Sequence, residues 1–521
     1  MLIEIDRHAG VPVYVQIHHQ LRELILSGTF FEETRLPPTR KLAKALDVNR
    51  ATVRNAYLRL WGEGLVEGRS GAGTVVLPQV PLGTHAAEEE RPLLSWDTLL
   101  AERAAPAADR LLSGAAASRA DAVSFAASCA GEDVCAELGV QEVLARPLLG
   151  SSGLVGAPHA QGDLALRKLL SERMGLTGIR ATPSQVLVLS SPEQGLHVVA
   201  RALLNRGDGV AIASPTCPAT LRALASAGAR LHLAPMDSEG IRLDVAEGIL
   251  THLRPKLLVV ETTFHNPTGA TLSIERRRAL LELSYRFRVP LLEHDTCSEI
   301  RYSGRAVPPL ATLDTQGHVL HLATCQVLPS LRIAWLVAPQ RVARHLALVK
   351  SSCGLDTSGL TQVMAAAFLP WLDGHLDKIL QAFQGRRDAA CGGLERHCHG
   401  LIRFSRPEGG FFLWGELQRG LTARALLDEA REEGVSFAPG SAFYPDGKGG
   451  NRALRLNFAA VGEAEIRTGV ERLGRAVRAA LTSSDATPQA DRRPRPAIQK
   501  RVASSAEERL PGAAWGRAKL K

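Results

Sequence analysis

Short β-rich runs alternate with helical stretches from about Ser118 to Leu481, and this alternation limits the possible folds more than any other feature. Parallel neighbouring strands need a long crossover, usually a helix, between them. Apolar runs bounded by helical segments are typical of strands buried on both faces. We therefore predict an α/β domain with a mostly parallel sheet over residues 118–481. The clearest strand candidates are Val186–Leu189, Gly209–Ala213, Lys256–Val260 and Val289–Leu292.

The 521 residues are enough for roughly two to four domains. We expect a compact unit at 1–78, a linker rich in Ala, Glu and Pro at 79–117, and a basic tail at 482–521. The tail carries nine Lys or Arg and four acidic residues, with few apolar ones, so we expect it to be disordered. It therefore supplies more than half of the net charge of +9.

Several function classes are excluded at this point. No apolar run approaches the ~20 residues of a membrane span, and the N-terminus lacks the regions of a signal peptide. The eight cysteines are scattered without a CxxC pair, as in proteins that keep free thiols in a reducing cytosol. His397, Cys398 and His399 are too close together for zinc ligation. We expect a cytoplasmic protein with no membrane contact and no metal site.

The first 78 residues have the pattern of a small DNA reader. Helical spacing predicts helices at 15–25, 40–46 and 50–60, with a tight turn at 47–49 between the last two, and a hairpin at 65–76. Two short helices around a tight turn are typical of a helix-turn-helix, and the hairpin would be its wing. Eight basic and three acidic residues between Arg35 and Arg69 would attract phosphates. The alternative is a three-helix accessory domain with a solvated basic face.

The segments "PVYVQIHHQLRELILSGTF" and "RLPPTRKLAKALDVNRATVRNAYLRLWGEGLVEGRSGAGTVV" closely resemble the GntR-type winged helix-turn-helix. Glu32 and Glu33 depart from it, because the family usually has Pro-Gly there. The resemblance implies that Arg40 and Arg50 contact phosphates or bases of double-stranded DNA. It also implies that Thr52, Val53 and Arg54 face the major groove, and that Gly71 lets the wing approach the backbone.

The segments "AQGDLALRKLLSERMGL", "FHNPTGATLS", "LLEHDTCSEIRYSG" and "PSLRIAWLVAP" occur in the order and spacing of class I aminotransferases. The large domain thus resembles fold type I of the pyridoxal phosphate enzymes. A domain of this type that follows a GntR-type DNA-binding domain is similar to the architecture of the MocR-type regulators. The resemblance covers residues 1 to about 481. It implies pyridoxal phosphate as the cofactor.

The residues that this cofactor needs are largely replaced. A Schiff base requires a lysine amine, and matching "HLATCQVLPSLR" to the family's "GTFSKxLxPxLR" puts Cys325 at that position. The carboxylate that holds the ring nitrogen becomes His294, with Asp295 beside it. The other replacements are Thr296 and Cys217 for two tyrosines, and Pro192 in the phosphate turn, where a backbone donor is lost.

Three functional positions are retained. By resemblance, Asn266 would bond the phenolic oxygen, Arg332 the phosphate, and Arg455 a substrate carboxylate. Each also has a structural interpretation: Asn266 precedes Pro267 in a turn, and the arginines could form internal ion pairs.

We therefore expect a DNA-binding transcription regulator and not an enzyme. Its large domain would form a homodimer and bind a small amino-acid-like or phosphate-bearing effector without covalent pyridoxal phosphate. The first alternative is an aminotransferase, or a cofactor-sensing regulator, that uses an unrecognised lysine such as Lys350. The second is a scaffold that binds DNA constitutively.

Overall fold

The structure is a computed structural model that describes residues 3–7, 10–31, 33–69, 73–77, 121–145, 159–354 and 356–485. It contains two compact units, which divide between Leu99 and Leu100, inside the expected linker. Gly71, the segment 79–117 and the tail beyond 485 lie outside the described residues. Residues 482–485, which we assigned to the tail, continue the last helix, α17 (Glu463–Asp485).

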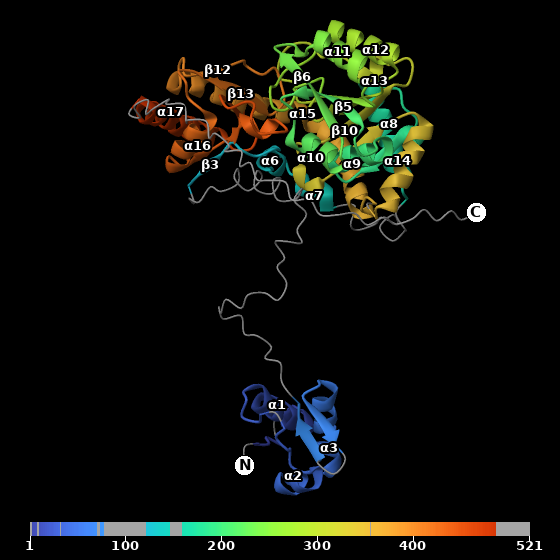
Figure 1. Ribbon diagram of the computed structural model, residues 1–521, viewed down its shortest axis with the longest axis vertical. Coiled ribbons are helices and arrows are strands. Elements are labelled where there is room, and N and C mark those ends of the chain that lie inside the picture. Colours follow the sequence, from blue (N-terminus) through green and yellow to red (C-terminus); the bar gives the residue numbers. More distant parts are fainter. Residues whose placement is uncertain are drawn as a thin grey trace, which may run out of the picture. The chain divides into compact units, whose positions relative to one another are not determined.

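The small unit has the predicted winged helix-turn-helix order (Figure 1). Asn49 caps α3 by accepting a hydrogen bond from the Ala51 amide, which fixes the end of the turn. Strands β1 and β2 pair antiparallel, with Val66 opposite Val76, and form the wing. The elements are α1 (Val13–Leu26), α2 (Thr39–Ala45), α3 (Arg50–Gly62), β1 (Val66–Arg69) and β2 (Gly73–Val76).

The core of the small unit corrects one sequence expectation. Val53 is completely buried and packs with Ala56, Tyr57 and Leu60 of α3 against α1. It therefore cannot face the major groove. Its position follows from helical spacing, because residues three and four apart share one face of a helix.

Glu33, where the sequence departs from the GntR pattern, is held in place by contacts with the wing. Glu33 has φ +64°, a left-handed conformation that glycine adopts more easily. Its carboxylate accepts hydrogen bonds from Arg69 Nη1 at 2.7 and 2.8 Å, and its amide donates to the Val76 carbonyl. The turn that the family builds with glycine is thus held here by contacts with both wing strands.

The large unit is built on an eight-stranded sheet with the order β4-β11-β10-β9-β8-β5-β6-β7. The pairs from β10 through β9, β8 and β5 to β6 are parallel, as predicted, and β11 and β7 run antiparallel to their neighbours. The strands are β4 (Val186–Leu189), β5 (Gly209–Ser214), β6 (Arg230–Asp237), β7 (Gly240–Ile241), β8 (Leu257–Val260), β9 (Leu291–Asp295), β10 (Val319–Thr324) and β11 (Ala334–Val337).

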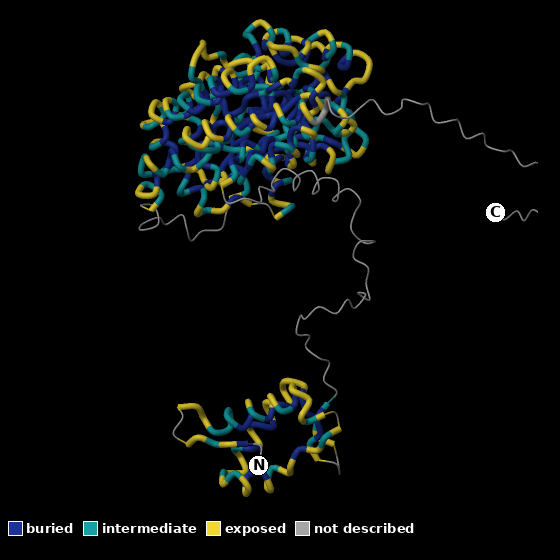
Figure 2. Tube along the Cα trace, turned by 90° about the vertical axis from the view of Figure 1, so that its left-hand side faces the viewer, coloured by how far each residue is buried: buried dark blue, intermediate teal, exposed yellow. Residues whose placement is uncertain are grey.

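Helices cover both faces of this sheet because its strands are apolar on both. Neighbouring residues of one strand belong to different cores: Leu257 and Leu292 pack with α9 and α14, whereas Leu258 and Leu291 pack with α11 and α12. In Figure 2 the buried segments of the large unit lie in its interior and the exposed segments at its surface. The helices are α8 (Leu164–Leu176), α9 (Pro192–Leu203), α10 (Pro218–Ser226), α11 (Leu243–Leu253), α12 (Ile274–Phe287), α13 (Leu310–Leu313) and α14 (Gln340–Ser352).

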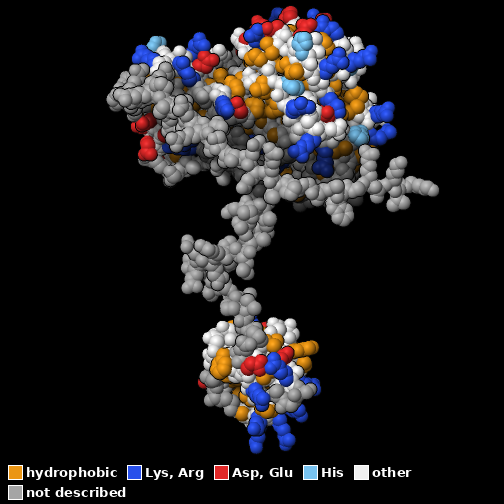
Figure 3. Space-filling model, in the orientation of Figure 1, with side chains coloured by type: hydrophobic (Ala, Val, Ile, Leu, Met, Phe, Trp, Pro, Cys, Tyr) orange, Lys and Arg blue, Asp and Glu red, His pale blue; other side chains and the backbone are white. Residues whose placement is uncertain are grey.

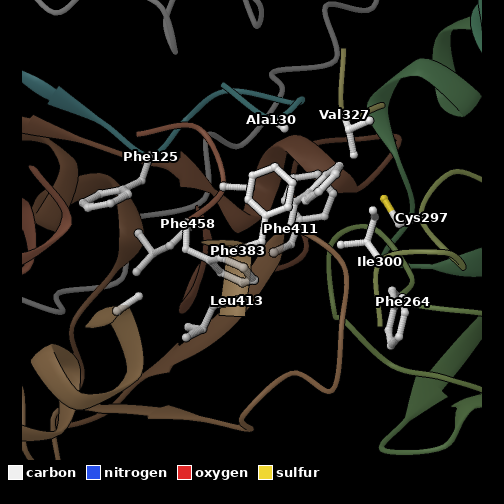
Figure 4. Close-up of a cluster of buried hydrophobic side chains, with 14 of the residues drawn as sticks. Phe125, Ala130, Phe264, Cys297, Ile300, Val327, Phe383, Phe411, Leu413 and Phe458 are labelled. Atoms are coloured by element: carbon white, nitrogen blue, oxygen red, sulfur yellow. The ribbon is translucent and has the colours of Figure 1, made fainter. Parts of the chain in front are cut away.

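A smaller antiparallel sheet, ordered β12-β13-β16-β15, completes the unit. Phe125, Phe383, Phe411 and Phe458 come from distant parts of the chain and meet in its core (Figure 4). These elements are α6 (Asp133–Glu137), α7 (Val140–Ala145), α15 (Gly359–His397), α16 (Ala423–Glu432), α17, β12 (Ile402–Phe404), β13 (Phe412–Leu417), β15 (Ala438–Pro439), β16 (Ala453–Asn457), and the pair β3 (Val123–Ser124) and β14 (Val435–Ser436).

In the parts of the chain that the structure describes, none of the helices has the length and apolar character of a membrane span. All eight cysteines are described, and each is a free thiol.

Candidate functional site

A cavity of about 850 Å³ opens where the parallel strands end. The segments that follow the carboxyl ends of β5, β8, β9 and β10 meet at one edge of the sheet, which is where α/β proteins bind ligands. Asn266, Arg332, Arg455 and His294 all border this cavity, as do Pro192, Cys217, Thr296 and Cys325. The structure therefore brings together all but one of the ligand-site residues singled out in the sequence.

That one is Asp295, whose assignment to the ligand site was wrong. It does not border the large cavity, and its carboxylate accepts hydrogen bonds from the amide and hydroxyl of Ser298 at 3.0 and 2.6 Å. The reason is the alternation of side chains along β9: Glu293 and Asp295 share one face and His294 points to the other. Asp295 instead lies 4.0 Å from His321 Nε2.

Cys325 stands directly after β10, at the cavity wall. It is buried, and burial raises the pKa of its thiol. Lys350 lies elsewhere, on α14, and does not border the cavity. Its Nζ is buried and donates to the Val188 carbonyl at 2.9 Å and to Thr357 Oγ1 at 3.2 Å, and burial lowers its pKa to about 8.

Glu261 is a site residue that we did not predict. It follows β8 directly, is buried, and its carboxylate lies 3.2 Å from His294 Nδ1 and 2.7 Å from the Asn266 amide. Burial alone would raise the pKa of Glu261, but the hydrogen bond from His294 holds it below its ordinary value. A carboxylate just after a buried run, at the edge where strands end, was the signal available in the sequence.

The other ring nitrogen of His294 has no hydrogen-bond partner in the described parts of the chain. Because Nδ1 donates to Glu261, neutral His294 presents Nε2 as an acceptor. That atom is buried and has no hydrogen-bond partner among the described residues, and the side chain borders the cavity. A buried orphan of this kind is costly unless a ligand or water satisfies it.

Arg455, on β16, is a buried cation without a carboxylate partner among the described residues. Its Nη2 donates to the carbonyls of Ala126 and Ala127, both at 2.7 Å, and its guanidinium lies over the ring of Phe412. Its Nε has no hydrogen-bond partner within the described ranges. Burial lowers the pKa of Arg455 to about 10. It therefore does not form the internal ion pair that was the structural alternative.

Asn266 connects these groups. Its amide donates to Glu261, and its side-chain Oδ1 lies 3.4 Å from Arg455 Nη1. Its Nδ2 faces Cys217 Sγ at 3.7 Å, and burial raises the pKa of that thiol to about 12. Asn266 thus links Glu261, the partner of His294, to Arg455.

The start of α9 borders the cavity where the family's phosphate turn lies. Pro192 has no amide hydrogen, and the Gln194 amide donates to Ser191 Oγ at 3.2 Å. Glu193 places a carboxylate on the same wall. Arg332, the expected phosphate ligand, is exposed and has φ +46°.

These residues do not fit pyridoxal phosphate as a covalent cofactor. Cys325 supplies no amine, and a buried histidine with an unpaired acceptor replaces the carboxylate at the ring nitrogen. The helix start that would hold the phosphate lacks one amide hydrogen and has another already bonded. In the described parts of the chain, no group of three or more His, Cys, Asp or Glu side chains could hold a metal ion.

The small unit presents a basic end (Figure 3), formed by α2 and the start of α3. Arg40, Arg50 and Arg54 are exposed, and Thr52 is half-buried. Arg50 Nε lies 3.3 Å from Thr39 Oγ1, which positions the guanidinium at the helix start. Apart from buried Val53 and the undescribed Gly71, the predicted DNA contacts are available on the surface.

Comparison with known proteins finds a matching family for each of the two units. The family "Aminotransferase class I and II" matches residues 140–473, and "Bacterial regulatory proteins, gntR family" matches residues 13–76. The uncharacterized HTH-type transcriptional regulator YisV of Bacillus subtilis is 28% identical over 92% of this chain and 98% of its own. The probable rhizopine catabolism regulatory protein MocR of Rhizobium meliloti is 29% identical over 94% and 98%.

Among solved structures, the α-aminoadipate aminotransferase LysN of Thermus thermophilus, complexed with N-(5'-phosphopyridoxyl)-L-leucine, is similar with a TM-score of 0.68 and 28% identity. The match covers 75% of this chain and all of the enzyme. The likeness therefore includes the sheet and the strand ends that form the cavity.

Proposed function

The chain belongs to the MocR-type regulators, in which a GntR-family DNA-binding domain precedes a domain of the aminotransferase class I and II family, and we propose that its large unit binds a small ligand non-covalently and does not catalyse transamination. Two residues of the cavity carry the proposal: Cys325 after the end of β10, and Arg455, a buried cation that has no counter-charge among the described residues. The first removes the reactive amine, and the second calls for an anion.

DNA reading is assigned to the basic end of the small unit. Arg40 and Arg50 reach phosphates or bases, while Thr52 and Arg54 lie on the groove side of α3. Arg50→Ala is expected to weaken specific binding by about 1–3 kcal/mol, or roughly 5- to 150-fold, because it removes a charge-assisted contact. A gel-shift titration on a fragment that the wild-type chain selects from a random library measures this.

Arg455→Ala is the matched control, since it removes a cation from the other unit. It is expected to leave DNA affinity without ligand unchanged and to remove the response to ligand. Equal loss of DNA binding in both variants would contradict this division between the units.

The large unit is proposed to form a homodimer, which gives two DNA readers and favours paired half-sites. Sedimentation velocity at micromolar concentration is expected to give a mass near twice the 55.9 kDa of the chain. A monomer throughout that range would refute the dimer.

Ligand binding controls DNA reading only if the ligand favours one arrangement of the readers over another. The cytoplasm, where DNA is accessible, is the proposed location. The alternative, a constitutive scaffold, predicts identical DNA affinity with and without every ligand. The cofactor-dependent alternative is disfavoured by the position of Lys350, whose amine is buried against Val188 and Thr357.

A further inference from the structure

We propose that Glu33 withholds Arg69 from DNA, so that the wing meets the duplex without the arginine nearest its tip and binding is weaker on every sequence. This rests on the proposed DNA-reading role and adds a residue that limits DNA affinity. Glu32 and Glu33 stand where the GntR pattern usually has Pro-Gly, so the arrangement is a feature of this chain.

The side chain of Arg69 starts beside the tip of the wing, but its guanidinium lies toward the base. Arg69 is the last residue of β1 and pairs with Gly73, the first residue of β2. Glu33 lies at the other end of the hairpin, because its amide donates to the carbonyl of Val76, which pairs with Val66. The ion pair between Arg69 Nη1 and Glu33, at 2.7 Å, therefore draws the arginine side chain back from the tip.

Two carboxylates hold this guanidinium. Arg69 Nη1 donates to both carboxylate oxygens of Glu33, at 2.7 and 2.8 Å, and Arg69 Nε donates to Glu67. Glu67 is two residues away on the same strand, so its side chain shares one face with Arg69. Charged groups in a network contribute more than an isolated surface pair. Glu33 is the partner that reaches Arg69 from the base of the wing.

The arrangement lies at the surface, where DNA can compete for the arginine. The side chain of Arg69 is 43% exposed and that of Glu33 is 56% exposed. Arginine binds phosphate through the same N–H donors that it uses for carboxylates. The contact of Nη1 with Glu33 and a contact of Nη1 with a DNA phosphate are therefore alternatives. Without the Glu33 carboxylate, we expect Arg69 to reach a phosphate beside the wing.

A gained phosphate contact has a characteristic effect on DNA binding. Phosphate contacts carry no sequence information, so they strengthen binding to every sequence by a similar factor. Each contact also steepens the plot of log affinity against log salt concentration by about 0.9, because condensed counterions are released. A gained base contact would instead favour one sequence.

Salt titration of DNA binding by the full chain tests the proposal. Glu33→Gly is the test variant, because glycine adopts the φ of +64° at this position easily and the fold is retained. Fluorescence anisotropy is measured on the fragment that the wild type selects and on a scrambled fragment. We expect the slope to steepen by about 0.9 on both, so that the gain over wild type is about threefold larger at ~50 mM than at ~200 mM salt.

Two control variants separate the release of Arg69 from the change in net charge. Glu23→Gln removes the same charge from an exposed position on α1 but frees no wing arginine, so we expect the wild-type slope. Glu33→Gly combined with Arg69→Gln has the net charge of the wild type and lacks the released arginine. Its slope should also return to the wild-type value.

The proposal is overturned if Glu33→Gly leaves the slope unchanged, if Glu23→Gln steepens it equally, or if the double variant keeps the steeper slope. It is also overturned if the gain appears on the selected fragment alone. Each of these results leaves the DNA-reading role intact, because Arg50→Ala tests that role separately. A wild-type chain that binds neither fragment would overturn the DNA-reading role itself.

Discussion

Replacing Glu293 by Gln will lower the free energy of unfolding of the large unit by about 3–5 kcal/mol, because it breaks a buried ion pair and leaves one partner behind. Glu293 is completely buried, and its carboxylate lies 2.9 Å from His321 Nδ1. The same carboxylate accepts hydrogen bonds from Thr262 Oγ1 at 2.7 Å and from the Leu310 amide at 2.8 Å. An amide can keep some of these bonds but cannot balance the charge of His321.

The pair also sets the pH range in which this stabilisation operates. Burial would raise the pKa of Glu293, but the His321 hydrogen bond lowers it from 4.5 to about 2, so its contribution is present above pH 4.5 and is lost as the pH falls toward 2. Burial would lower the pKa of His321, but Glu293 raises it above 6.5. The contribution of His321 is therefore complete below pH 6.5 and is lost as the pH rises through the raised value. The difference between wild type and Glu293→Gln should be largest between pH 4.5 and 6.5.

Differential scanning calorimetry across this pH range measures the effect. Glu247→Gln is the matched control, because Glu247 pairs with Arg286 at the surface, where both side chains are about half exposed. Such a pair contributes only about 0–1 kcal/mol. Equal shifts of the melting temperature in the two variants would show that burial does not strengthen the Glu293–His321 pair.

Most of the fold was predictable because each helix and strand keeps the pattern of apolar residues that is typical of its kind. The apolar runs at Val186–Leu189 and Gly209–Ala213 became β4 and β5, since a strand buried on both faces needs no polar alternation. The run beginning at Val289 was predicted two residues too early. Pro290 has no amide for the ladder, and β9 begins at Leu291.

The candidate site was predictable only in part. Motif order placed His294, Asn266, Cys325 and Arg455 correctly around one cavity, because residues after parallel strands meet at one sheet edge. The partner of each group could not be predicted, since it depends on tertiary contacts: Glu261 lies 33 residues from His294 in the chain. The alternation along β9 could have excluded Asp295 once Glu293 and His321 were known to pair.

No specific lysine will form a borohydride-reducible adduct with pyridoxal phosphate. An imine needs an amine held at the aldehyde, and a misplacement of even ~0.5 Å impairs such a site. Cys325 occupies the expected position, and the Lys350 amine is enclosed between the Val188 carbonyl and Thr357. Reduction in the presence of the cofactor, followed by peptide mass mapping, should show only scattered, substoichiometric labelling of surface lysines. One lysine labelled to near completion would restore the cofactor-dependent interpretation.

The variant Cys325→Lys tests whether the missing amine is the only defect of the cofactor site. If Cys325 were the only defect, this variant would be labelled stoichiometrically. We expect its labelling to stay at the surface level, because the start of α9 still lacks the Pro192 amide and still carries Glu193, and His294 still stands in place of the ring-nitrogen carboxylate. Adding the Pro192→Ala and Glu193→Gln changes should raise labelling at residue 325 above that of the single variant. Full labelling of Cys325→Lys alone would instead mean that the start of α9 can still hold the phosphate, in spite of Pro192 and Glu193.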